Sequence, residues 1–454
     1  MESQKPFHVI IVGCGLVGLT AAHIFSRAGI DFTVLEKHDT VVSLHGTTLA
    51  LWPQTLRVFD QMGLLSAIQP SLDYVNEVIT LSTKDARIRM RDDTVTLVEK
   101  NHGHGIRITH RPELVKFLYE SLSETVKPFI LLEKRVVDIK LLEDGVKVLC
   151  AGGSTHEGSI VVGADGVRSN VRVIMRSLVN DKRPENLPQD QRCPYTPTYR
   201  LYFGRIPVLP GLAANTRYDG TCDGLSTQIV TGTDRAWFGV YEHIRSPTPT
   251  VTRYTEADKL KILDRCGHLY MAPGWKVHEV DANRIGDTGL IDLEEGLIKK
   301  WASKRIVLVG DAVRKLEPHA GLGYNSGVTD LVVLVNGLRR LLQHDRTPDM
   351  EAMKGLFEAY EHERLRDTKK MAGISSKTAR LLAWLSWKDR ITAKYLLPNI
   401  PLSRISINNT IGPLISKTPV LEWLEEAALP RSLISWKHHP ITQRKFDERS
   451  HGVR

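Results

Sequence analysis

Val307-Leu308-Val309-Gly310-Asp311-Ala312 is an apolar run that ends in a Gly-Asp pair, and Pro318-His319-Ala320-Gly321-Leu322-Gly323 follows it shortly after. An Asp at a strand end, placed before a glycine-rich helix start, suits a phosphorylated cofactor. The carboxylate can accept a sugar or polyol hydroxyl, and the backbone N–H groups of the next helix can face an anion. Two further motifs in the chain sharpen this interpretation.

The second motif opens the chain, where residues 7–12 are a short apolar run typical of a buried parallel strand. The three glycines of a G-x-G-x-x-G follow directly: Gly13, Gly15 and Gly18. Helical periodicity over 16–28 and a strand over 32–35 lead to Glu36. The glycines allow backbone to approach a pyrophosphate closely, and Glu36 can hydrogen-bond an adenosine ribose. We therefore expect a dinucleotide site, with a ligand-free glycine turn as the alternative.

The third motif is Gly163-Ala164-Asp165-Gly166, at the end of the apolar run 160–162. A helix is expected after it, and Asp165 can cap that helix by accepting backbone N–H bonds. A capping role and a cofactor role for Asp165 are weighed equally.

With these motifs in this order, residues 7–330 resemble the class A flavin-dependent monooxygenases. The resemblance implies FAD as cofactor, NAD(P)H as reductant and O2 as oxidant. It also implies oxygen transfer through a flavin C4a-hydroperoxide. The expected fold class is α/β: a Rossmann-like FAD-binding domain, an inserted mixed β-sheet substrate domain and a helical C-terminal region.

The resemblance also assigns cofactor-binding residues. These are Gly13, Gly15, Gly18, Glu36, Ala50, Arg111, Asp165, Asp311, Pro318, Gly321, Gly323 and Tyr324. Arg111, before Pro112 at a helix start, matches the family's Arg-x-x-Leu, and a solvated arginine is the alternative. Residues 46–50 resemble the mobile loop that brings Ala50 to the isoalloxazine. Two departures are Arg314, expected near the flavin or in solvent, and Tyr324, expected to wall the substrate pocket.

The domain organisation follows from the pattern along the chain. Alternating segments within 75–97 and the runs 199–204 and 236–241 predict strands of a substrate sheet. Helices are expected from 349 to 387 and again over 421–424. The expected parts are FAD-binding 1–73, 105–179 and 289–348, substrate-binding 74–104 and 180–288, and helical 349–454.

Composition describes an ordinary globular chain of 454 residues, 42% apolar and 25% charged. The net charge is +9, and we interpret Lys and Arg as scattered, so no nucleic-acid partner is expected. The five cysteines show neither a disulfide framework nor a zinc pattern, so no metal is expected and a reducing compartment is favoured. No signal peptide and no bilayer-length apolar run is seen, which favours a cytoplasmic location without a membrane span.

Only one G-x-G-x-x-G is present, which argues that NAD(P)H visits, reduces the flavin and leaves. Flavin oxygen transfer needs no protein nucleophile, so we expect no catalytic triad among the 17 histidines. The segment 180–204 and the C-terminal half look most like fungal epoxidases, and among these the spiro-oxindole-forming enzymes of the paraherquamide type. This implies a small hydrophobic indole-containing substrate.

On this interpretation an indole 2,3-epoxide opens and rearranges by a semipinacol shift. A fixed guanidinium would stabilise the developing alkoxide, and Arg192, then Arg200, are the catalytic candidates. The alternatives are an aromatic-ring hydroxylase of the salicylate type, a meroterpenoid or indole-diterpene alkene epoxidase, and a flavin-fold binding protein such as the Rab GDP-dissociation inhibitors. Retention of Glu36, Arg111, Asp165 and Asp311 speaks against the last.

Overall fold

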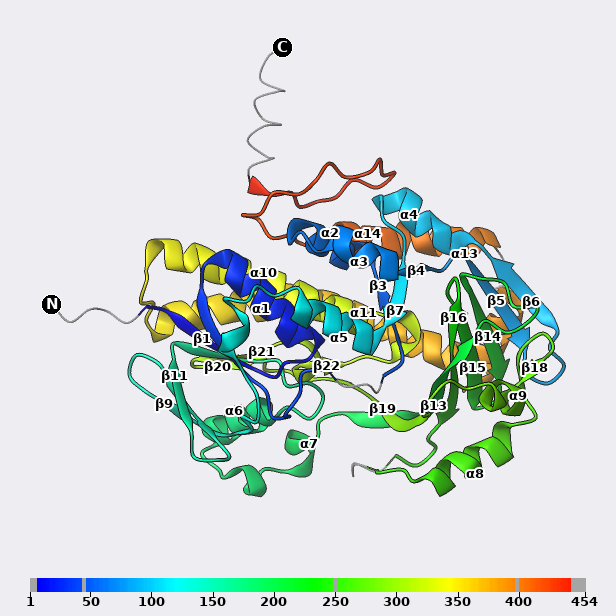
Figure 1. Cartoon of the computed structure of the whole chain (residues 1–454), viewed down its shortest axis with the longest axis horizontal. Coiled ribbons are helices and arrows are strands. Elements are labelled where there is room, and N and C mark those ends of the chain that lie inside the picture. The colour runs from blue at the N-terminus through cyan, green and yellow to red at the C-terminus, as the bar shows by residue number, and fades with distance from the viewer. Residues whose placement is uncertain (1–5, 43–45, 248–251, 397–399, 442–454) are drawn as a thin grey trace, which may run out of the picture.

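A six-stranded sheet forms the centre of the cofactor unit in this computed structural model, which describes residues 6–42, 46–247, 252–396 and 400–441 (Figure 1). Its strand order is β20-β21-β12-β1-β2-β8. The strands are β20 (Ala302–Ser303), β21 (Ile306–Leu308), β12 (Ile160–Gly163), β1 (His8–Val12), β2 (Asp31–Leu35) and β8 (Ile130–Leu131). All pairings except β20–β21 are parallel. The central strands are almost entirely Val and Ile and are buried, as expected for a parallel sheet covered on both faces.

Helices cover one face of this sheet and a small sheet with one helix covers the other (Figure 1). The first layer is α1 (Leu16–Ala28), α5 (Arg111–Glu120), α10 (Gly323–His344) and α11 (Met350–Leu382). The second layer is β9 (Val136–Leu141), β10 (Val146–Cys150), β11 (Thr155–Gly158) and α6 (Asn170–Asn180). Helix α1 begins and ends where the sequence predicts, and Gly29 stops it with a φ of +66°.

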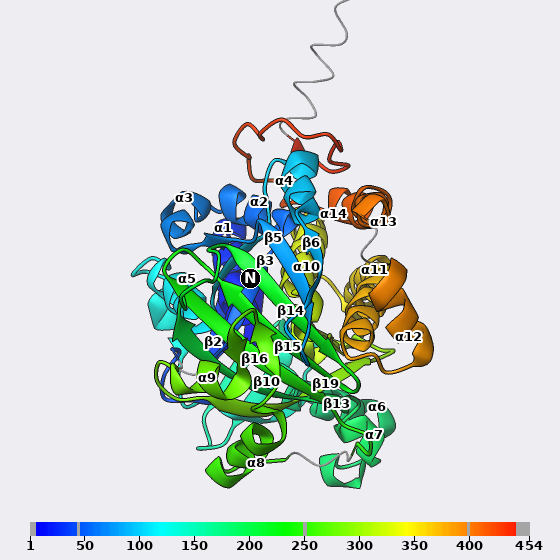
Figure 2. The same ribbon diagram turned by 90° about the vertical axis from the view of Figure 1, so that its right-hand side faces the viewer.

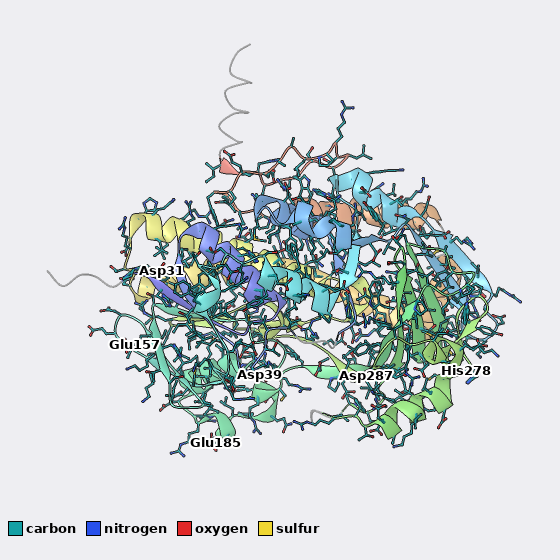
Figure 3. The ribbon with its side chains drawn as sticks, viewed as in Figure 1. Asp31, Asp39, Glu157, Glu185, His278 and Asp287 are labelled. Carbon is teal, nitrogen blue, oxygen red and sulfur yellow. The ribbon has the colours of Figure 1, made fainter. Side chains whose placement is uncertain are left out.

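The carboxyl ends of the parallel strands face the rest of the molecule. Asp31, the first residue of β2, and Glu157 of β11 lie at the far end of the cofactor unit, whereas Asp39, just after β2, lies nearer the middle (Figure 3). His278 lies at the opposite end, in the substrate unit, and Asp287 lies nearer the middle (Figure 3). Ligands of open α/β sheets bind at the carboxyl edge, which here lies between the two units.

The substrate unit is an eight-stranded mixed sheet in the order β22-β19-β13-β16-β15-β14-β5-β6. Its strands are β22 (Arg314–Lys315), β19 (Gly289–Leu297), β13 (Thr196–Pro207), β16 (Arg235–His243), β15 (Leu225–Thr231), β14 (Thr216–Cys222), β5 (Glu77–Ser82) and β6 (Ile88–Asp92). The expected boundary at 288 does not separate the units, because β19 pairs along most of β13 and with β22. The segment from 289 therefore belongs to the substrate sheet before the chain returns to the cofactor unit.

The two faces of this sheet have different partners. The outer face packs on α8 (Glu256–Cys266) and α9 (Val277–Ala282) through side chains such as Tyr202, Phe238 and Val240. The inner face packs Tyr199, Leu201 and Tyr241 against Ala379 and Ala383 near the end of α11. Successive side chains of a strand alternate between faces, so each strand contributes to both cores.

A third, three-stranded sheet connects the two units. It consists of β3 (Thr48–Leu51), β7 (Arg107–His110) and β4 (Asp73–Tyr74). The segment expected to be a mobile loop at Ala50 is thus largely the strand β3, held by antiparallel pairing with β7. Residues 43–45, which precede it, lie outside the described residues.

The described part of the C-terminal region is mainly helical as far as residue 416. It continues from α11 through α12 (Trp387–Ile391), the π-helix η7 (Thr392–Leu396), α13 (Ile400–Ser406), the π-helix η8 (Ile407–Ile411) and α14 (Gly412–Ser416) (Figure 2). The remaining elements are α2 (Pro53–Gln61), α3 (Leu65–Ile68), α4 (Leu97–His102), α7 (Gln189–Arg192), β17 (Tyr270–Ala272), β18 (Trp275–Lys276) and six short 3-10 turns, η1 (Gln69–Ser71), η2 (Thr94–Thr96), η3 (Lys127–Phe129), η4 (Pro184–Asn186), η5 (Gly310–Ala312) and η6 (Pro318–Ala320).

Residues 418–440, here termed the C-terminal strap, contain no helix, so the helix expected over 421–424 is wrong. Side chains of other elements take up the strap's backbone groups. Gln61 donates to the carbonyl oxygens of Leu421 and Leu424, both at 2.9 Å. The buried Arg57 donates to both carboxylate oxygens of Glu426, at 2.7 and 2.5 Å. The strap is therefore held by tertiary contacts that compete with local helix formation.

Candidate functional site

The glycine-rich turn between β1 and α1 leaves space at the start of α1. A Cβ atom at Gly13, whose φ is +101°, would lie 2.8 Å from the carbonyl oxygen of Ala164, and one at Gly18 would lie 1.9 Å from that of Gly13. No atom lies within 4 Å of the Cβ position at Gly15. Gly15 is the N-cap and offers no side chain to the first N–H groups, and the first turn carries no acidic residue. The turn is therefore closed by packing on one side and open to an anion on the other.

Glu36 stands at the end of β2 and is buried beside this turn. Its Oε2 accepts a hydrogen bond from the backbone nitrogen of Cys14 at 2.7 Å. Its Oε1 accepts one from the backbone nitrogen of His38 at 3.0 Å and lies 2.6 Å from the His38 ring. Glu36 thus orders the glycine-rich turn, a role that the sequence did not suggest.

One carboxylate oxygen of Asp165 accepts hydrogen bonds and the other accepts none from the described residues. Oδ2 caps α6 by accepting hydrogen bonds from the backbone nitrogens of Asn170, at 2.7 Å, and Val171, at 3.0 Å. Oδ1 is buried without a hydrogen-bond partner in the described part of the chain. Burial raises the pKa of this carboxyl against the opposing effect of the hydrogen bonds from Ser169 and the helix backbone. The backbone of Asp165 lies beside Gly13, so this residue adjoins the glycine-rich turn.

The Gly310-Asp311 motif leads to a second open helix start. Asp311 forms an ion pair with Lys315 at 2.7 Å, so a cofactor hydroxyl at Asp311 would share this carboxylate with an ammonium group. The charge of Asp311, ahead of the opposing desolvation, raises the pKa of Lys315. No atom lies within 4 Å of the Cβ position at Gly323, the first residue of α10, and no side chain caps that helix.

Asn325 holds the turn before α10 against β3. Its Nδ2 donates to the carbonyl oxygens of Ala50, at 2.8 Å, and Gly321, at 2.7 Å, and its Oδ1 accepts from the backbone nitrogen of Trp52 at 2.9 Å. Gly321 has a φ of +62°, and a Cβ atom there would lie 2.6 Å from that of Ala50. The segments carrying Ala50, Pro318 and Gly321 are therefore in direct contact, as the resemblance implies.

Arg111 is the first residue of α5, and Pro112 follows it at the helix start. Its backbone nitrogen donates to the carbonyl oxygen of Thr47 at 3.0 Å, which places the helix start beside β3. The side chain is exposed and has no hydrogen bond or ion pair to the described residues. Arg111 is thus available to a ligand at this position.

Together these features fit FAD. Two uncapped helix starts, at Gly15 and Gly323, suit the pyrophosphate and the electron-poor ring system, and Glu36 and Asp165 offer carboxylate oxygens to sugar or polyol hydroxyls. At Gly15 and Gly323 the space beside the helix start is open, and a side chain in place of the glycine would occupy it.

Both motif departures are buried. Arg314 does not point to solvent, because it is buried and lies 2.6 Å from the carboxylate of Asp330. Tyr324 does not wall a substrate pocket, because its ring lies in the core of the cofactor unit and its hydroxyl is 2.8 Å from that of Thr20 on α1. The positions of Arg314 and Tyr324 cannot be predicted from their sequence neighbours, because their partners, Asp330 and Thr20, lie elsewhere in the chain.

The two candidate arginines differ in position. Arg200 lies on the outer face of the substrate sheet, where it donates to the hydroxyl of Tyr254 at 2.7 Å and forms an ion pair with Glu242 at 3.4 Å. It therefore lies on the face of the sheet opposite to Tyr199 and Leu201. Arg192, at the end of α7, is exposed and has no side-chain hydrogen bond or ion pair among the described residues. Three residues later, Tyr195 donates its hydroxyl to the carbonyl oxygen of Asp311 at 3.1 Å.

The structure reveals a buried polar pair that the sequence analysis missed, Glu317 and His319. Their carboxylate Oε2 and ring Nδ1 lie 3.7 Å apart, and neither atom has a hydrogen-bond partner in the described residues. Thr198 donates to the other carboxylate oxygen of Glu317. The expectation of no catalytic triad among the histidines drew no attention to His319, although it lies inside the Pro-x-x-Gly motif.

Aromatic residues of the inner sheet face surround His319. Its ring centroid lies 4.1 Å from that of Tyr241 and 5.9 Å from that of Tyr199, and its Nε2 lies 3.5 Å from the hydroxyl of Ser226. The Tyr199 hydroxyl is also buried without a partner among described residues. Burial, assisted by the charge of Glu317, raises the pKa of Tyr199. A hollow of about 300 Å³ reaches Glu317 from between β19 and α11.

Comparison with known proteins agrees with this geometry. The "FAD binding domain" family profile matches residues 7–177 and 277–374. The FAD-dependent monooxygenase srdH of Neurospora crassa is 33% identical over 414 residues, which cover 86% of this chain and 90% of that protein. The FAD-dependent monooxygenase DEP2 of Fusarium langsethiae is 30% identical over 453 residues, covering 96% and 84%.

Among solved structures, Klebsiella pneumoniae HpxO in complex with FAD and uric acid superposes with a TM-score of 0.72 at 18% identity, over 90% of this chain and 96% of that one. FqzB superposes with a TM-score of 0.65 at 20% identity, over 90% and 94%. These two show the shared fold. The chain belongs to the family of FAD-binding monooxygenases, and it is an FAD-dependent monooxygenase.

Proposed function

We propose that this enzyme uses NAD(P)H and O2 to epoxidise the indole 2,3-bond of a prenylated indole alkaloid, and that the product rearranges by a semipinacol shift to a spiro-oxindole in fungal secondary metabolism. FAD, when bound and reduced, supplies the activation of O2. The chain supplies binding, orientation, exclusion of water and protons.

The observation that carries the proposal is the buried Glu317–His319 pair beneath the aromatic inner face. Opening an indole epoxide creates negative charge on oxygen, and a proton donor or a cation at that point lowers the barrier. His319 lies between Pro318 and Gly321, two of the residues expected at the cofactor. Its unpaired ring Nδ1 is therefore a suitable atom to hold and transfer a proton, with the Glu317 carboxylate to stabilise the charged imidazole.

The aromatic side chains on the inner face of the substrate sheet favour the proposal of an apolar, planar substrate. Tyr199 and Tyr241 flank His319, and Trp237 lies further along β16 on the same face with Val75, Ile108 and Val230. Aromatic walls bind flat ring systems by stacking, and their low polarity excludes the water that would otherwise capture a reactive intermediate.

Arg192 is proposed as the cation that assists ring opening. It lies three residues from Tyr195, whose hydroxyl contacts the Asp311 backbone at 3.1 Å, so the α7 segment is attached to the Gly-Asp motif. Three residues of chain span at most about 10 Å, and an arginine side chain can reach several ångströms further. The guanidinium of Arg192, unpaired among the described residues, can then turn toward the cofactor when substrate binds.

The alternative is an aromatic-ring hydroxylase, with the same Glu317–His319 pair acting as a base toward a phenol. The experiment that separates the two is a product screen with purified protein, NAD(P)H and 18O2. One panel holds prenylated indole alkaloids and polyprenyl alkenes, and the other holds simple aromatic acids. A spiro-oxindole carrying one 18O supports the proposal, whereas a phenolic product from an aromatic acid rejects it.

A further inference from the structure

The chain carries an unusual concentration of positive charge in one stretch. Residues 369–417 contain nine Lys or Arg side chains and one acidic residue, Asp389, which gives +8 of the net charge of +9. The basic residues are Lys369, Lys370, Lys377, Arg380, Lys388, Arg390, Lys394, Arg404 and Lys417. The interpretation of Lys and Arg as scattered is therefore wrong. The rest of the chain is almost neutral, so this stretch sets the electrostatic character of the molecule.

Large apolar side chains are exposed in the same stretch. Of the 17 large hydrophobic side chains that are exposed in the described part of the chain, six lie between residues 387 and 405. They are Trp387, Ile391, Tyr395, Leu396, Leu402 and Ile405. Trp387 is 69% exposed and Tyr395 is 72% exposed. Isolated exposed apolar residues are ordinary, but a cluster marks a surface that binds something.

The cluster forms a stripe on α12 and η7. Trp387, Ile391 and Tyr395 recur at four-residue spacing, so they lie on one side of this short helical segment, and that side faces solvent. Lys388, Arg390 and Lys394 lie between them. The apolar stripe of a typical surface helix faces the core, so this segment has the opposite orientation. We call residues 387–396 the basic aromatic face.

Two cations of this face and one from β6 gather around the indole of Trp384, which lies just before the face. The side chains of Arg390, Lys394 and Arg89 of β6 approach the ring of Trp384 at 5.4, 5.0 and 5.2 Å. One carboxylate, Asp223, is 3.6 Å from Arg390. Partial desolvation, then the charges of Arg390 and Arg89, lower the pKa of Lys394. Cations outnumber carboxylates in this arrangement, which favours a polyanionic partner.

We propose that the basic aromatic face docks on the surface of an anionic lipid bilayer. Trp and Tyr side chains favour the interface between headgroups and acyl chains, and Lys and Arg bind anionic headgroups. A short amphipathic helix with both lies in the plane of the interface without crossing it. Among the described residues, none of the helices is long and apolar enough to cross a membrane.

The positive charge of the basic aromatic face argues against a second copy of the chain as its binding partner. A symmetric contact would place the same surface on both partners, so two strongly positive faces would meet. A bilayer containing anionic lipid complements both the charge and the protruding aromatic side chains.

The position of the face gives the docking a consequence for substrate entry. Figure 2 shows α12 and α13 on the same flank as α11, beside the substrate sheet. A second hollow, of about 460 Å³, lies along α11 and is rimmed by Lys370, Lys377 and Lys417. Both hollows are lined by Gly373, and the first reaches Glu317. An apolar molecule dissolved in the bilayer would then lie near these hollows, the first of which reaches Glu317.

The test is flotation of the purified full chain with vesicles. One set is phosphatidylcholine alone and the other contains 30% phosphatidylserine, each at low and high salt. We expect binding to the anionic set, weakened by salt. Each cation near an anionic surface contributes about 1 kcal/mol, so Lys388→Glu should weaken binding roughly tenfold or more. Trp387→Ala should weaken binding to the same vesicles. The matched control is Phe129→Ala with Lys140→Glu, an exposed aromatic and an exposed cation of the cofactor unit, which should bind as wild type.

Several outcomes overturn the proposal: no binding to either vesicle set, equal binding to both, or Lys388→Glu binding as wild type. Two parallel measurements address other occupants. Binding of a fluorescent single-stranded oligonucleotide that Trp387→Ala abolishes, without vesicle binding, assigns the face to nucleic acid. A concentration-dependent dimer in sedimentation that Trp387→Ala dissociates, again without vesicle binding, assigns it to self-association. None of these measurements depends on the substrate or on turnover, so the proposed epoxidation can fail while docking stands.

Discussion

The carboxylate of Asp330 accepts a hydrogen bond from the backbone nitrogen of Gly310 at 3.0 Å, across 20 residues of sequence. The same carboxylate forms ion pairs with Arg314, at 2.6 Å, and with Arg364 of α11, at 2.9 Å, and all three side chains are buried. Gly310 has a φ of +63°, and Asp330 holds it in that conformation. The position of Asp311 at the cofactor cradle therefore depends on a charge network inside the core.

Removing the carboxylate of Asp330 should destabilise the protein strongly. Asp330→Ala leaves two buried guanidinium groups without an acid, which costs about 3–5 kcal/mol of unfolding free energy. Denaturant unfolding measures this loss, and Arg340→Ala is the control because its pair with Glu422 is largely exposed. That control should change stability by less than about 1 kcal/mol. Equal effects of the two variants would contradict a structural role for the network.

Two glycines of the first motif should respond differently to alanine. Gly18→Ala places a Cβ atom 1.9 Å from a backbone oxygen and should impair folding, whereas Gly15→Ala meets open space and should fold normally. Because that space is the expected pyrophosphate position, we expect Gly15→Ala to weaken FAD binding by roughly tenfold or more. Flavin fluorescence titration of the apoprotein and circular dichroism measure the two effects. Unchanged FAD affinity in a folded Gly15→Ala protein would place the cofactor elsewhere.

His319→Gln should lower turnover by a factor on the order of 100, since positioned proton donors contribute about 10²–10⁴-fold. FAD binding and the rate of flavin reduction should change little, because the ring faces the substrate sheet. Single-turnover kinetics separate reduction from oxygen transfer, and the ratio of rearranged to unrearranged product reports proton delivery. Ser226→Ala, a neighbour at 3.5 Å, is the matched control. Full turnover with an unchanged product ratio in His319→Gln would remove the pair from the mechanism.

Arg192→Ala should alter the product or its stereochemistry with little effect on stability, because the side chain is exposed. Arg200→Ala, on the outer face, should change stability modestly through its contacts with Tyr254 and Glu242, and should leave the product unchanged. Product analysis by chiral chromatography, together with thermal unfolding, makes the comparison. The reverse pattern would contradict the assignment of the two faces.

Two buried histidines predict acid sensitivity. Burial lowers the pKa of His23 to about 4, although its hydrogen bond to the Leu118 carbonyl oxygen opposes the shift, and burial lowers the pKa of His102 to about 4. In the unfolded chain these histidines bind protons near pH 6.5, whereas in the folded protein they stay neutral until about pH 4. The free energy of unfolding therefore falls as the pH drops from 6.5 toward 4. The expected slope is up to about 1.4 kcal/mol per pH unit for each group. Denaturant unfolding across this range should show a shallower slope for His102→Leu and an unchanged one for the exposed His268→Leu.

The parts of the fold that could be predicted from sequence are those set by local signals. The strand, glycine turn and helix at the start of the chain, and the helix at Arg111-Pro112, follow from burial patterns and backbone conformations that a few adjacent residues determine. The three cofactor motifs were found in the same way, and the family comparison confirms FAD.

The parts that could not be predicted depend on partners far away in sequence. Alternation shows that Arg200 and Leu201 point to opposite sides of β13, but both sides are covered, so the pattern does not reveal which one faces the cofactor. The burial of Arg314 depends on Asp330, and that of His319 on Tyr199 and Tyr241. The positive charge of residues 369–417 can be predicted from the sequence, but only by summing charge along the chain.

The contact between Arg57 and Glu426 spans 369 residues, and it has a consequence for biosynthesis. A ribosome adds about 5–20 residues per second, so Arg57 emerges on the order of 20–70 s before its acid partner. Throughout that interval helix α2 lacks the strap that satisfies Arg57 and Gln61. The nascent cofactor unit therefore lacks these contacts until the chain has been synthesised as far as Glu426.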